Sequence, residues 1–534
     1  MSWVRVTRIW LAALICLGQL TTAAAQDHPA IASSASSASI DPAYAPLIDS
    51  VEADYLRSTE DLTRYEFDGR FTPASEDADA RIQGRVEITY RNHTGVPLDT
   101  IYLRLYANAP EYADGEMKII RSTVDDASAP GLFSQNDTLY SIPLETPLSE
   151  NDSARITTTF ETVIPTDPRQ SFGMFKYDTS TNTYLLAHWL PLLAGWDAEY
   201  GWNTGPVSIN GDPIFTEAAV FDVDLVTPAD LIFVSSGSLI DQWTDELSTQ
   251  WHFASGPSRD FVMAASIDFE VQERQVGETT VRSYALPSSQ SGASRVLESG
   301  ASALELYSDL IGEYPYEELD LVQADVGNGA GGVEFPGLAF IGSDFYDSDE
   351  LVPDKPGFLD FVVVHEVAHQ WFYGVIGNNQ YQHAFLDESL ANYLSIVYYA
   401  AVYGATEANR QANLELRLGY FDLLFDTGDQ VIDQPSDAFP TMRAYGRIIY
   451  GKGALAFMEL RREIGTDAFF AALQQYYEDF AFEIAQPDDL KAAFEAASGQ
   501  NLDEFWTHWF EEAAGEEDFD ATDLARLLRE IDDK

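Results

Sequence analysis

The sequence predicts a multidomain protein in which an antiparallel β domain is followed by a mostly α-helical α+β domain. Up to about residue 272, short runs of alternating apolar and polar residues are separated by Gly, Asn, Asp and Pro, which is typical of β-strands joined by turns. From about residue 273, apolar residues recur at intervals of three and four over long stretches, which predicts amphipathic helices. The 534 residues, 46% of them hydrophobic, are enough for two or three domains with ample cores.

Residues 1–25 are typical of a secretory signal peptide. Two arginines precede an apolar run at 9–20, and three alanines provide a small-residue cleavage site at the end of the segment. The run is too short to span a bilayer, and cleavage would remove Cys16, the only cysteine. We therefore expect an exported protein (periplasmic, secreted or cell-surface) with no membrane span and no disulfide bond in its mature form. Residues 26–50 are rich in Ala, Ser and Pro and are expected to form a flexible linker.

The β domain is expected at 51–272. Alternating runs at 85–90 (RVEITY) and 100–106 (TIYLRLY) predict strands that bury one face. Shorter apolar runs at 218–226 and 231–237 predict further strands of the same domain.

The second domain is expected at 273–513. It begins with a helical stretch near 291–313 and a strand-like run at 319–325, followed by a glycine-rich segment at 327–337. Residues 514–534 form an acidic C-terminal tail with one last helical pattern at 521–532. Between the glycine-rich segment and the tail, further helices are predicted at 357–374, 387–403, 406–425, 445–464, 466–480, 487–497 and 501–513.

The charge balance excludes two classes of partner. Thirty Lys and Arg residues stand against 87 Asp and Glu residues, which gives a formal net charge of −57. A field of this sign repels nucleic acids and anionic membrane surfaces, so neither is expected to bind. The acidic residues are expected to form a solvated shell that keeps the protein soluble, and this shell would suit salty surroundings because salt screens the repulsion.

Two histidines four residues apart predict a metal site. His365 and His369 belong to the segment HEVAH, which follows an apolar run at 361–364. Residues i and i+4 project from the same face of a helix, so both imidazoles can reach one ion. Glu366 lies between them, where it can contact a water at the ion without binding the metal itself.

A third metal ligand is expected from Glu388. A catalytic zinc usually takes three protein ligands and leaves one position open for water. Eighteen residues separate His369 from Glu388, which is enough to end one helix, turn and bring a second helix alongside. Glu388 lies in the first turn of that second helix, where a carboxylate is also a common capping residue. Combined with the histidine pair, it predicts one Zn²⁺ per chain.

Four segments in sequence order resemble the gluzincin aminopeptidases, the family of aminopeptidase N and leukotriene-A hydrolase. The first is GGVEF at 331–335, which resembles the Gly-x-Met-Glu-Asn motif of the family with Val and Phe in place of Met and Asn. HEVAHQWF at 365–372 and DESLANY at 387–393 resemble its zinc motifs. YGKGA at 450–454 resembles its Tyr-x-Lys-Gly-Ala segment. The likeness covers roughly 273–513.

The resemblance implies both a fold and an activity. The fold would be a saddle-like β domain packed on a thermolysin-like zinc peptidase domain. The activity would be hydrolysis of the N-terminal peptide bond of peptides with free N-termini. Zinc would be held by His365, His369 and Glu388.

The resemblance also implies roles for further residues. Glu366 would be the general base and Tyr450 the donor that stabilises the oxyanion, with Tyr445 as the competing phenol. Glu334 would bind the α-ammonium of the substrate, and Gly331 and Gly332 would let the substrate backbone approach closely. A second amine ligand is expected from the β domain, and the region to search is 182–190.

Alternative functions remain compatible with the sequence. Only 84 residues follow Tyr450, whereas larger family members carry a helical C-terminal domain that closes off the active site. A more open cleft would favour a zinc endopeptidase. A non-catalytic binding protein on the same fold is the third interpretation, but it would not need the zinc ligands together with Glu366 and Tyr450. An epoxide hydrolase activity, found in one family branch, is also compatible with the sequence.

Overall fold

The computed structural model describes residues 46–48, 62–112, 115–168, 174–208, 210–211, 214–327, 330–346 and 356–532. The predicted signal peptide at 1–25 lies outside these residues, as does most of the predicted linker at 26–50. Within the described part of the chain, no helix is both long enough and apolar enough to cross a membrane.

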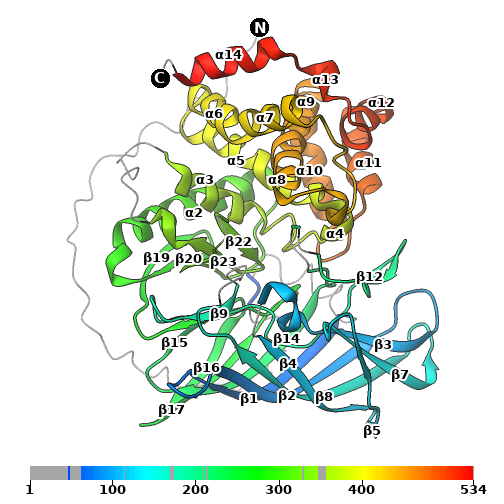
Figure 1. Ribbon diagram of the computed structural model, residues 1–534, viewed down its shortest axis with the longest axis vertical. Coiled ribbons are helices and arrows are strands. Elements are labelled where there is room, and N and C mark those ends of the chain that lie inside the picture. Colours follow the sequence, from blue (N-terminus) through cyan, green and yellow to red (C-terminus); the bar gives the residue numbers. More distant parts are fainter. Residues whose placement is uncertain are drawn as a thin grey trace. The chain divides into compact units, whose positions relative to one another are not determined.

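An eight-stranded sheet forms the base of the N-terminal domain (Figure 1). Its long strands bury alternate side chains, as in SARITTTFETVI of β8, so one face packs on the core and the other faces solvent. All pairings are antiparallel except the one between β1 and β14, which is parallel. The strand order is β16 (Ser238–Thr244), β17 (Ser248–Ala254), β14 (Ala219–Pro228), β1 (Thr63–Thr72), β2 (Ala80–Arg91), β8 (Ser153–Ile164), β4 (Glu116–Val124) and β5 (Ala127–Ser128).

Three smaller sheets complete the N-terminal domain. The first contains β15 (Ile232–Ser235), β18 (Met263–Ser266), β10 (Thr183–Leu186) and β9 (Phe175–Asp178). The second contains β11 (Leu192–Leu193), β3 (Leu98–Arg104), β7 (Leu139–Leu148) and β6 (Leu132–Ser134). The third pairs β12 (Trp196–Asp197) with β13 (Gly201–Trp202). The strands predicted from the four apolar runs therefore lie in β2, β3, β14 and β15.

A five-stranded mixed sheet begins the second domain. Its order is β19 (Glu270–Val276), β20 (Thr279–Ala285), β21 (Glu318–Ala324), β23 (Leu338–Gly342) and β22 (Gly332–Phe335). Because β19 pairs with β20, residues 270–272 belong to this sheet, whereas the sequence placed the domain boundary after residue 272. The difference arises because β19 reads EVQERQV and is largely exposed, so it carries no alternation that would reveal a strand.

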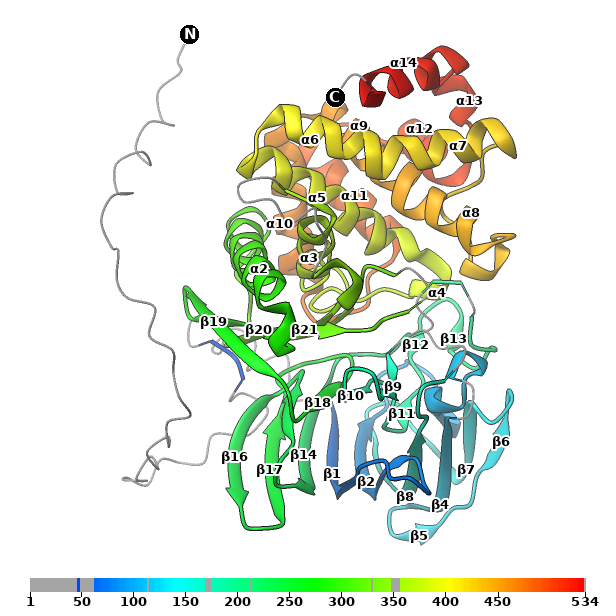
Figure 2. The same ribbon diagram turned by 60° about the vertical axis from the view of Figure 1, so that its left-hand side comes forward.

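Helices form the remainder of the second domain, so the predicted order of a β domain and a mostly helical domain is confirmed (Figure 2). The predicted helices at 406–425, 445–464 and 501–513 each contain a π-helical segment: Ala412–Arg417, Arg447–Gly453 and Thr507–Glu511. The predicted helix of the C-terminal tail is α14 (Ala521–Asp532). It packs against α7 (Leu418–Asp426) and buries Leu527. The helices are α2 (Gln290–Leu310), α3 (Phe358–Ala368), α4 (Gln380–His383), α5 (Glu388–Val402), α6 (Ala405–Gln411), α7 (Leu418–Asp426), α8 (Met442–Gly446), α9 (Ala454–Ile464), α10 (Thr466–Phe480), α11 (Pro487–Ser498), α12 (Asp503–Trp506), α13 (Gly515–Asp518) and α14 (Ala521–Asp532).

Helix α3 ends at Ala368, earlier than the predicted residue 374, because a buried arginine of the β domain holds the following loop. Arg259 donates from Nε to the carbonyl of Tyr373 at 2.7 Å and from Nη2 to the carbonyl of Val375 at 3.0 Å. Tyr373 has a φ of 110°, which no regular helix accommodates. A Cβ at Gly377 would lie 2.1 Å from Cζ of Arg259, so only glycine fits beside the guanidinium. This contact joins the two domains at the loop that follows α3.

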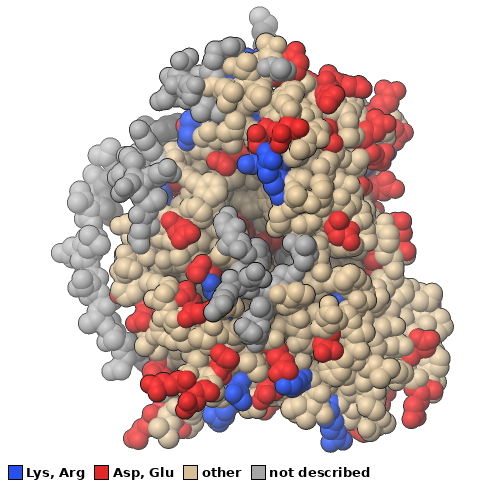
Figure 3. All heavy atoms as spheres, in the orientation of Figure 1, with Lys and Arg blue, Asp and Glu red and all other residues tan. Residues whose placement is uncertain are grey.

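The exposed surface is strongly acidic, as the composition predicts. Figure 3 shows acidic side chains spread over this face of both the helical and the β-rich regions, with few basic side chains between them. The same face is hollowed between the two regions.

Candidate active site

Every residue of helix α3 after Phe358 is buried, which restricts the positions of their side chains. Its first turn is anchored by Asp360, which accepts hydrogen bonds from the Gly357 amide at 2.7 Å and the Ser299 hydroxyl at 2.6 Å. Asp360 also forms an ion pair with Arg295 of α2. The helix is therefore held rigidly between α2 and the sheet, and this rigidity suits a catalytic site.

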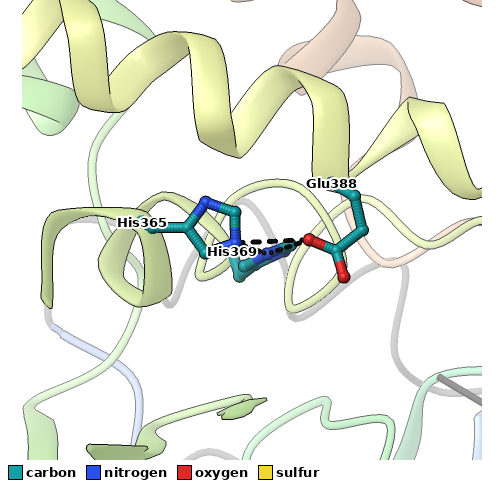
Figure 4. A group of neighbouring side chains, drawn as sticks. All are labelled: His365, His369 and Glu388. Carbon is teal, nitrogen blue, oxygen red and sulfur yellow. Dashed lines mark hydrogen bonds and ion pairs between the residues drawn. The ribbon is translucent and has the colours of Figure 1, made fainter. Parts of the chain in front are cut away.

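His365, His369 and Glu388 meet at one point between α3 and α5 (Figure 4). The two Nε2 atoms lie 3.1 Å apart, and each lies 3.2 Å from Oε2 of Glu388. Around a tetrahedral zinc with bonds of about 2.0–2.1 Å, neighbouring ligand atoms are separated by about 3.3 Å. Two imidazoles and one carboxylate are also a ligand set that zinc uses in catalytic sites. The triad therefore fits one Zn²⁺, as the sequence predicted.

The charges of the triad stabilise one another. Burial raises the pKa of Glu388, but contacts with the two imidazoles outweigh it and hold this pKa below its usual value. Burial lowers the pKa of His369, yet the surrounding carboxylates Glu334, Glu388 and Glu366 raise it well above its usual value. The pKa of His365 is lowered, mainly by burial. A concentration of carboxylates around buried imidazoles favours a cation in their midst.

The tautomer of His369 is set by the loop after α3. Its Nδ1 lies 3.0 Å from the carbonyl oxygen of Phe372, so Nδ1 donates and Nε2 is free to bind a metal. Asp387 caps α5 by accepting from the Glu388 amide at 2.7 Å, which fixes the backbone of the third ligand.

Glu366 faces the edge strand β22. Its Oε2 is buried and has no hydrogen-bond partner among the described residues. A Cβ at Gly332 would lie 2.6 Å from Oε1 of Glu366, and a Cβ at Gly331 would lie 2.6 Å from Cγ2 of Val362. The two glycines are thus required by the close packing of β22 on α3. The sequence interpretation assigned them only to the approach of substrate.

Glu334 lies in β22 next to the triad. Burial raises its pKa to about 7, with contributions of opposite sign from His369 and Glu388. Its Oε1 is buried and has no hydrogen-bond partner in the described structure. Gln370, one residue after the histidine pair, holds the strand in place by donating to the carbonyl of Phe335 at 3.0 Å and accepting from the Gly337 amide at 2.8 Å.

The side chain of Gln380 also lies next to Glu334. Its amide is close enough to lower the pKa of Glu334. Gln380 is buried, and neither polar atom of its amide has a hydrogen-bond partner among the described residues. An amide oxygen without a partner beside a carboxylate is suited to accept hydrogen bonds from a cation.

Tyr450 contacts the triad from the π-helical segment Arg447–Gly453. Its hydroxyl donates to Oε1 of Glu388, and its ring centroid lies 5.8 Å from that of His365. The segment is fastened to α5 by Asn392, which donates to the carbonyl of Tyr450 at 2.6 Å, and by Ser389. Such π-helical turns occur frequently at functional sites.

The predicted site residues are therefore brought together from three elements: α3, the edge of the five-stranded sheet and the region where α5 meets the π-helical segment. Comparison with known proteins agrees with this arrangement. Residues 295–509 match the model of the peptidase family M1 domain. This part of the chain is an M1 peptidase domain.

Full-length relatives share this M1 domain at low sequence identity. The rice protein "Aminopeptidase M1-B" (Oryza sativa subsp. japonica) is 26% identical over 301 residues, which are 54% of this chain and 34% of the relative. "Aminopeptidase N" of Streptomyces lividans is 28% identical over 207 residues, 38% of this chain and 24% of the relative. The chain thus spans about a third or less of the length of these relatives.

Solved structures extend the likeness to both domains. A point mutant of the M1 zinc metallopeptidase from Deinococcus radiodurans superimposes with a TM-score of 0.59 at 18% identity, covering 85% of this chain and 94% of that one. A second structure of that mutant is described as bound to a Tyr-Ser-Ala substrate, with a TM-score of 0.57 at 17% identity, covering 84% and 93%. These likenesses show that the chain has the two-domain M1 fold.

Several residues of the M1 site escaped the sequence interpretation. Gln370, Ser389 and Asn392 belong to the recognised segments, but their roles depend on which backbone groups the fold brings opposite them. Gln380 lies outside those segments. The sequence predicts a second amine ligand from the β domain, within the region 182–190. In that stretch, His188 is buried, its Nδ1 lies 2.8 Å from the Tyr112 hydroxyl, and desolvation lowers its pKa to about 3.

Proposed function

We propose that the protein is a zinc-dependent aminopeptidase that hydrolyses the first peptide bond of peptides with a free N-terminus. The observation that carries the proposal is the position of Glu334, a buried carboxylate beside the zinc triad with an unpartnered oxygen. Burying a carboxylate without a cation is costly, and a substrate ammonium would supply the missing charge. The Tyr-Ser-Ala substrate of the Deinococcus radiodurans enzyme is a peptide of the kind that this site would accept.

The groups that act on the substrate, Glu366, Tyr450 and Glu334, lie next to the triad. Bound zinc supplies a Lewis acid that polarises a carbonyl and makes water nucleophilic near neutral pH. Oε2 of Glu366, which has no partner among the described residues, takes the proton of the attacking water and passes it to the leaving amine. Burial and the neighbouring Glu334 raise the pKa of Glu366 well above its usual value, which favours its holding this proton between the two steps.

Tyr450 stabilises the negative charge that develops on the carbonyl oxygen. Burial raises the pKa of its phenol well above the usual value, so the group stays a neutral donor at all working pH values. The hydroxyl is already directed at the triad through its hydrogen bond to Glu388, and a small rotation aims it at an oxyanion instead.

Glu334 and Gln380 fix the N-terminus of the substrate. The carboxylate forms a charge-assisted hydrogen bond to the ammonium, and the amide oxygen of Gln380 accepts a second one. With the ammonium held there, only the first peptide bond lies over the metal. This positioning distinguishes an aminopeptidase from an endopeptidase.

A double-mutant cycle between Glu334 and the substrate amine tests the proposal. A charge-assisted hydrogen bond contributes about 1.5–3 kcal/mol, so Glu334→Ala is expected to lower kcat/KM for free-amine peptides by about 10- to 150-fold. N-acetylation is expected to cause a similar loss in the wild type and little further loss in the variant. Asp344→Ala, which removes an exposed acid at the end of the same sheet, is the matched control and is expected to behave as wild type.

An endopeptidase would give the opposite result. It would cleave internal bonds of acetylated peptides as fast as free N-terminal bonds, and it would be nearly indifferent to Glu334→Ala. That outcome would remove the aminopeptidase assignment while leaving the zinc site in place.

We also propose that the protein is exported through residues 1–25. The mature chain is then expected to begin at Gln26, which N-terminal sequencing of the native protein can test. A native chain that retains Met1 would contradict the proposal.

A further inference from the structure

A cavity outside the zinc site is lined by residues of both the β domain and the catalytic domain. Its volume is about 250 Å³, and its walls come from Arg104, residues 200–206 and Ser208 of the β domain and from Asn379, Tyr381 and Gln382 of the catalytic domain. Tyr200, Trp202 and Tyr381 contribute aromatic side chains to the wall. The volume lies below the range of about 300–1,000 Å³ for pockets that bind drug-sized ligands, so the cavity suits part of a peptide.

One buried cation lines this cavity and has no anionic partner among the described residues. Arg104, at the end of β3, is 1% exposed. Its guanidinium donates from Nη1 to the carbonyl of Gly205 at 2.8 Å and from Nη2 to Oδ1 of Asn203 at 2.7 Å. Its Nε is buried and has no hydrogen-bond partner in the described structure. No ion pair within the described ranges includes Arg104, although the chain contains 87 acidic residues.

A buried arginine normally has a carboxylate partner, because desolvating its charge is costly. The two hydrogen bonds hold the guanidinium plane in place and leave further N–H groups unassigned. Among the described residues of the cavity wall, Arg104 is also the single charged one. The cavity therefore offers one fixed positive charge, which matches a monoanionic carboxylate better than a dianionic phosphate.

The cavity is connected to the proposed amine-binding site through α4. Gln380 lies beside Glu334, while its neighbours Asn379, Tyr381 and Gln382 line the cavity. Asn379 is fixed by a hydrogen bond of 3.0 Å to Asp197 of the β domain. This short helix and its N-cap residue thus contribute to both the proposed amine-binding site and the cavity.

We propose that this cavity is a substrate subsite that binds a carboxylate group of the peptide through Arg104. The inference rests on the proposed peptidase function and adds a preference among its substrates. The carboxylate is either an acidic side chain or the free C-terminus of a short peptide. In both cases the guanidinium supplies paired N–H donors, and the aromatic walls pack against the adjacent aliphatic atoms.

Two series of free-amine peptides distinguish the sources of the carboxylate. The first series places Glu or Gln at each of the first three positions of a peptide amide. The second compares di-, tri- and tetrapeptides that end in a carboxylate or a carboxamide. The wild type is expected to favour the carboxylate member of at least one matched pair by about 10-fold or more in kcat/KM. Equal rates for every pair would overturn the proposal.

Two substitutions at Gly205 test the site without removing Arg104. A Cβ at Gly205 meets no atom within 4 Å, so the first atom of a new side chain causes no clash. Gly205→Glu would place a carboxylate beside Arg104 and is expected to abolish the preference, whereas the neutral Gly205→Gln of equal size is expected to retain most of it. Equal effects of the two substitutions would mean that the cavity acts by shape alone, and the proposal would be wrong.

Arg104→Gln is expected to reduce the preference by about 10-fold or more, with little change for the carboxamide peptides. Arg259→Gln is the matched control, because Arg259 is equally buried and bonds to carbonyl groups outside this cavity. A loss of stability lowers all rates together and leaves the ratio unchanged.

Binding measured without turnover separates this proposal from the proposed function. In the zinc-loaded Glu366→Gln background, calorimetry is expected to show about 10-fold weaker binding of the preferred carboxylate peptide when Gly205→Glu is added. If the wild type hydrolyses no peptide but this difference in binding is present, the function fails and the carboxylate site stands. If peptides are hydrolysed but the difference is absent, the carboxylate site fails alone.

Discussion

Gly332 of the edge strand lies directly against the carboxylate of Glu366. A Cβ on this glycine would stand 2.6 Å from Oε1 and 2.7 Å from Cδ. The strand β22, which carries Glu334, therefore also restricts the position of Glu366, the proposed general base. The same packing contact thus influences both substrate binding and proton transfer.

Gly332→Ala is expected to lower kcat by about 100-fold, because a displacement of about 1 Å in a catalytic group can cost that much. Zinc content is expected to stay near one per chain, since the three atoms nearest to the added Cβ all belong to Glu366 and not to a zinc ligand. The control is Gly446→Ala, where an added Cβ meets no atom within 4 Å. Steady-state kinetics and metal analysis check the prediction, and an unchanged kcat would show that Glu366 is not confined by this contact.

Tyr450→Phe is expected to lower kcat by about 10²- to 10³-fold, the usual cost of removing one oxyanion donor. Tyr445→Phe is expected to stay within a few-fold of wild type. The two phenols differ in direction: Tyr450 donates to Glu388, whereas the Tyr445 hydroxyl lies against Gly211 of the β domain. Single-turnover rates for both variants decide between them, and a larger loss at Tyr445 would reverse the assignment.

The zinc site was predictable because its residues lie on helices, where sequence spacing fixes distance. His365 lies in α3 and His369 caps its C-terminal end with helical backbone angles, so a separation of four residues places both side chains on one face. Glu388 begins the next long helix. The positions of Gln370 and Asn392 in the site depend on backbone groups of β22, of the turn that follows it and of the π-helical segment. Spacing along one chain segment carries no information about such long-range partners.

Long-range partners in the β domain could not be predicted from the sequence either. The parallel pairing of β1 with β14 joins residues about 150 positions apart, and no local pattern selects a parallel over an antiparallel neighbour. The sequence reveals the glycine-rich segment at 327–337 but not the strand β22 inside it, because glycine weakens the alternation by which strands are found. Arg104 and Arg259 also gave no signal, since a buried arginine looks the same in the sequence as an exposed one.

Removal of zinc by chelation is expected to abolish activity, and adding Zn²⁺ is expected to restore it. His365→Ala or Glu388→Ala is expected to reduce zinc occupancy well below one per chain. Affinity for zinc is expected to fall as the pH falls, because neighbouring carboxylates raise the pKa of His369 and a proton must leave the imidazole before it can bind metal. Equilibrium dialysis in zinc buffers at pH 5.5 and 7.5 measures this difference, and full activity of the metal-free protein would contradict the metallopeptidase assignment.

Asp260 is expected to make the stability of the protein depend on pH. This residue is buried, its Oδ1 accepts from the Phe261 amide at 2.7 Å, and its Oδ2 has no hydrogen-bond partner among the described residues. Burial raises its pKa from 3.8 to about 7. A raised carboxyl pKa means that the folded state prefers the protonated form. The folded state is therefore progressively destabilised, relative to the unfolded state, as the pH rises from about 4 to about 7.

Asp260→Asn cannot ionise and keeps the oxygen that accepts from Phe261. At pH 8 the variant is expected to be more stable than the wild type, by an amount on the order of a few kcal/mol. This advantage is expected to shrink at pH 5, where the wild-type carboxyl is protonated in the folded state. Urea unfolding at both pH values measures the difference, and Asp126→Asn on the exposed surface controls for the loss of one negative charge. If the two proteins differ by the same amount at pH 5 and pH 8, Asp260 does not titrate in this range.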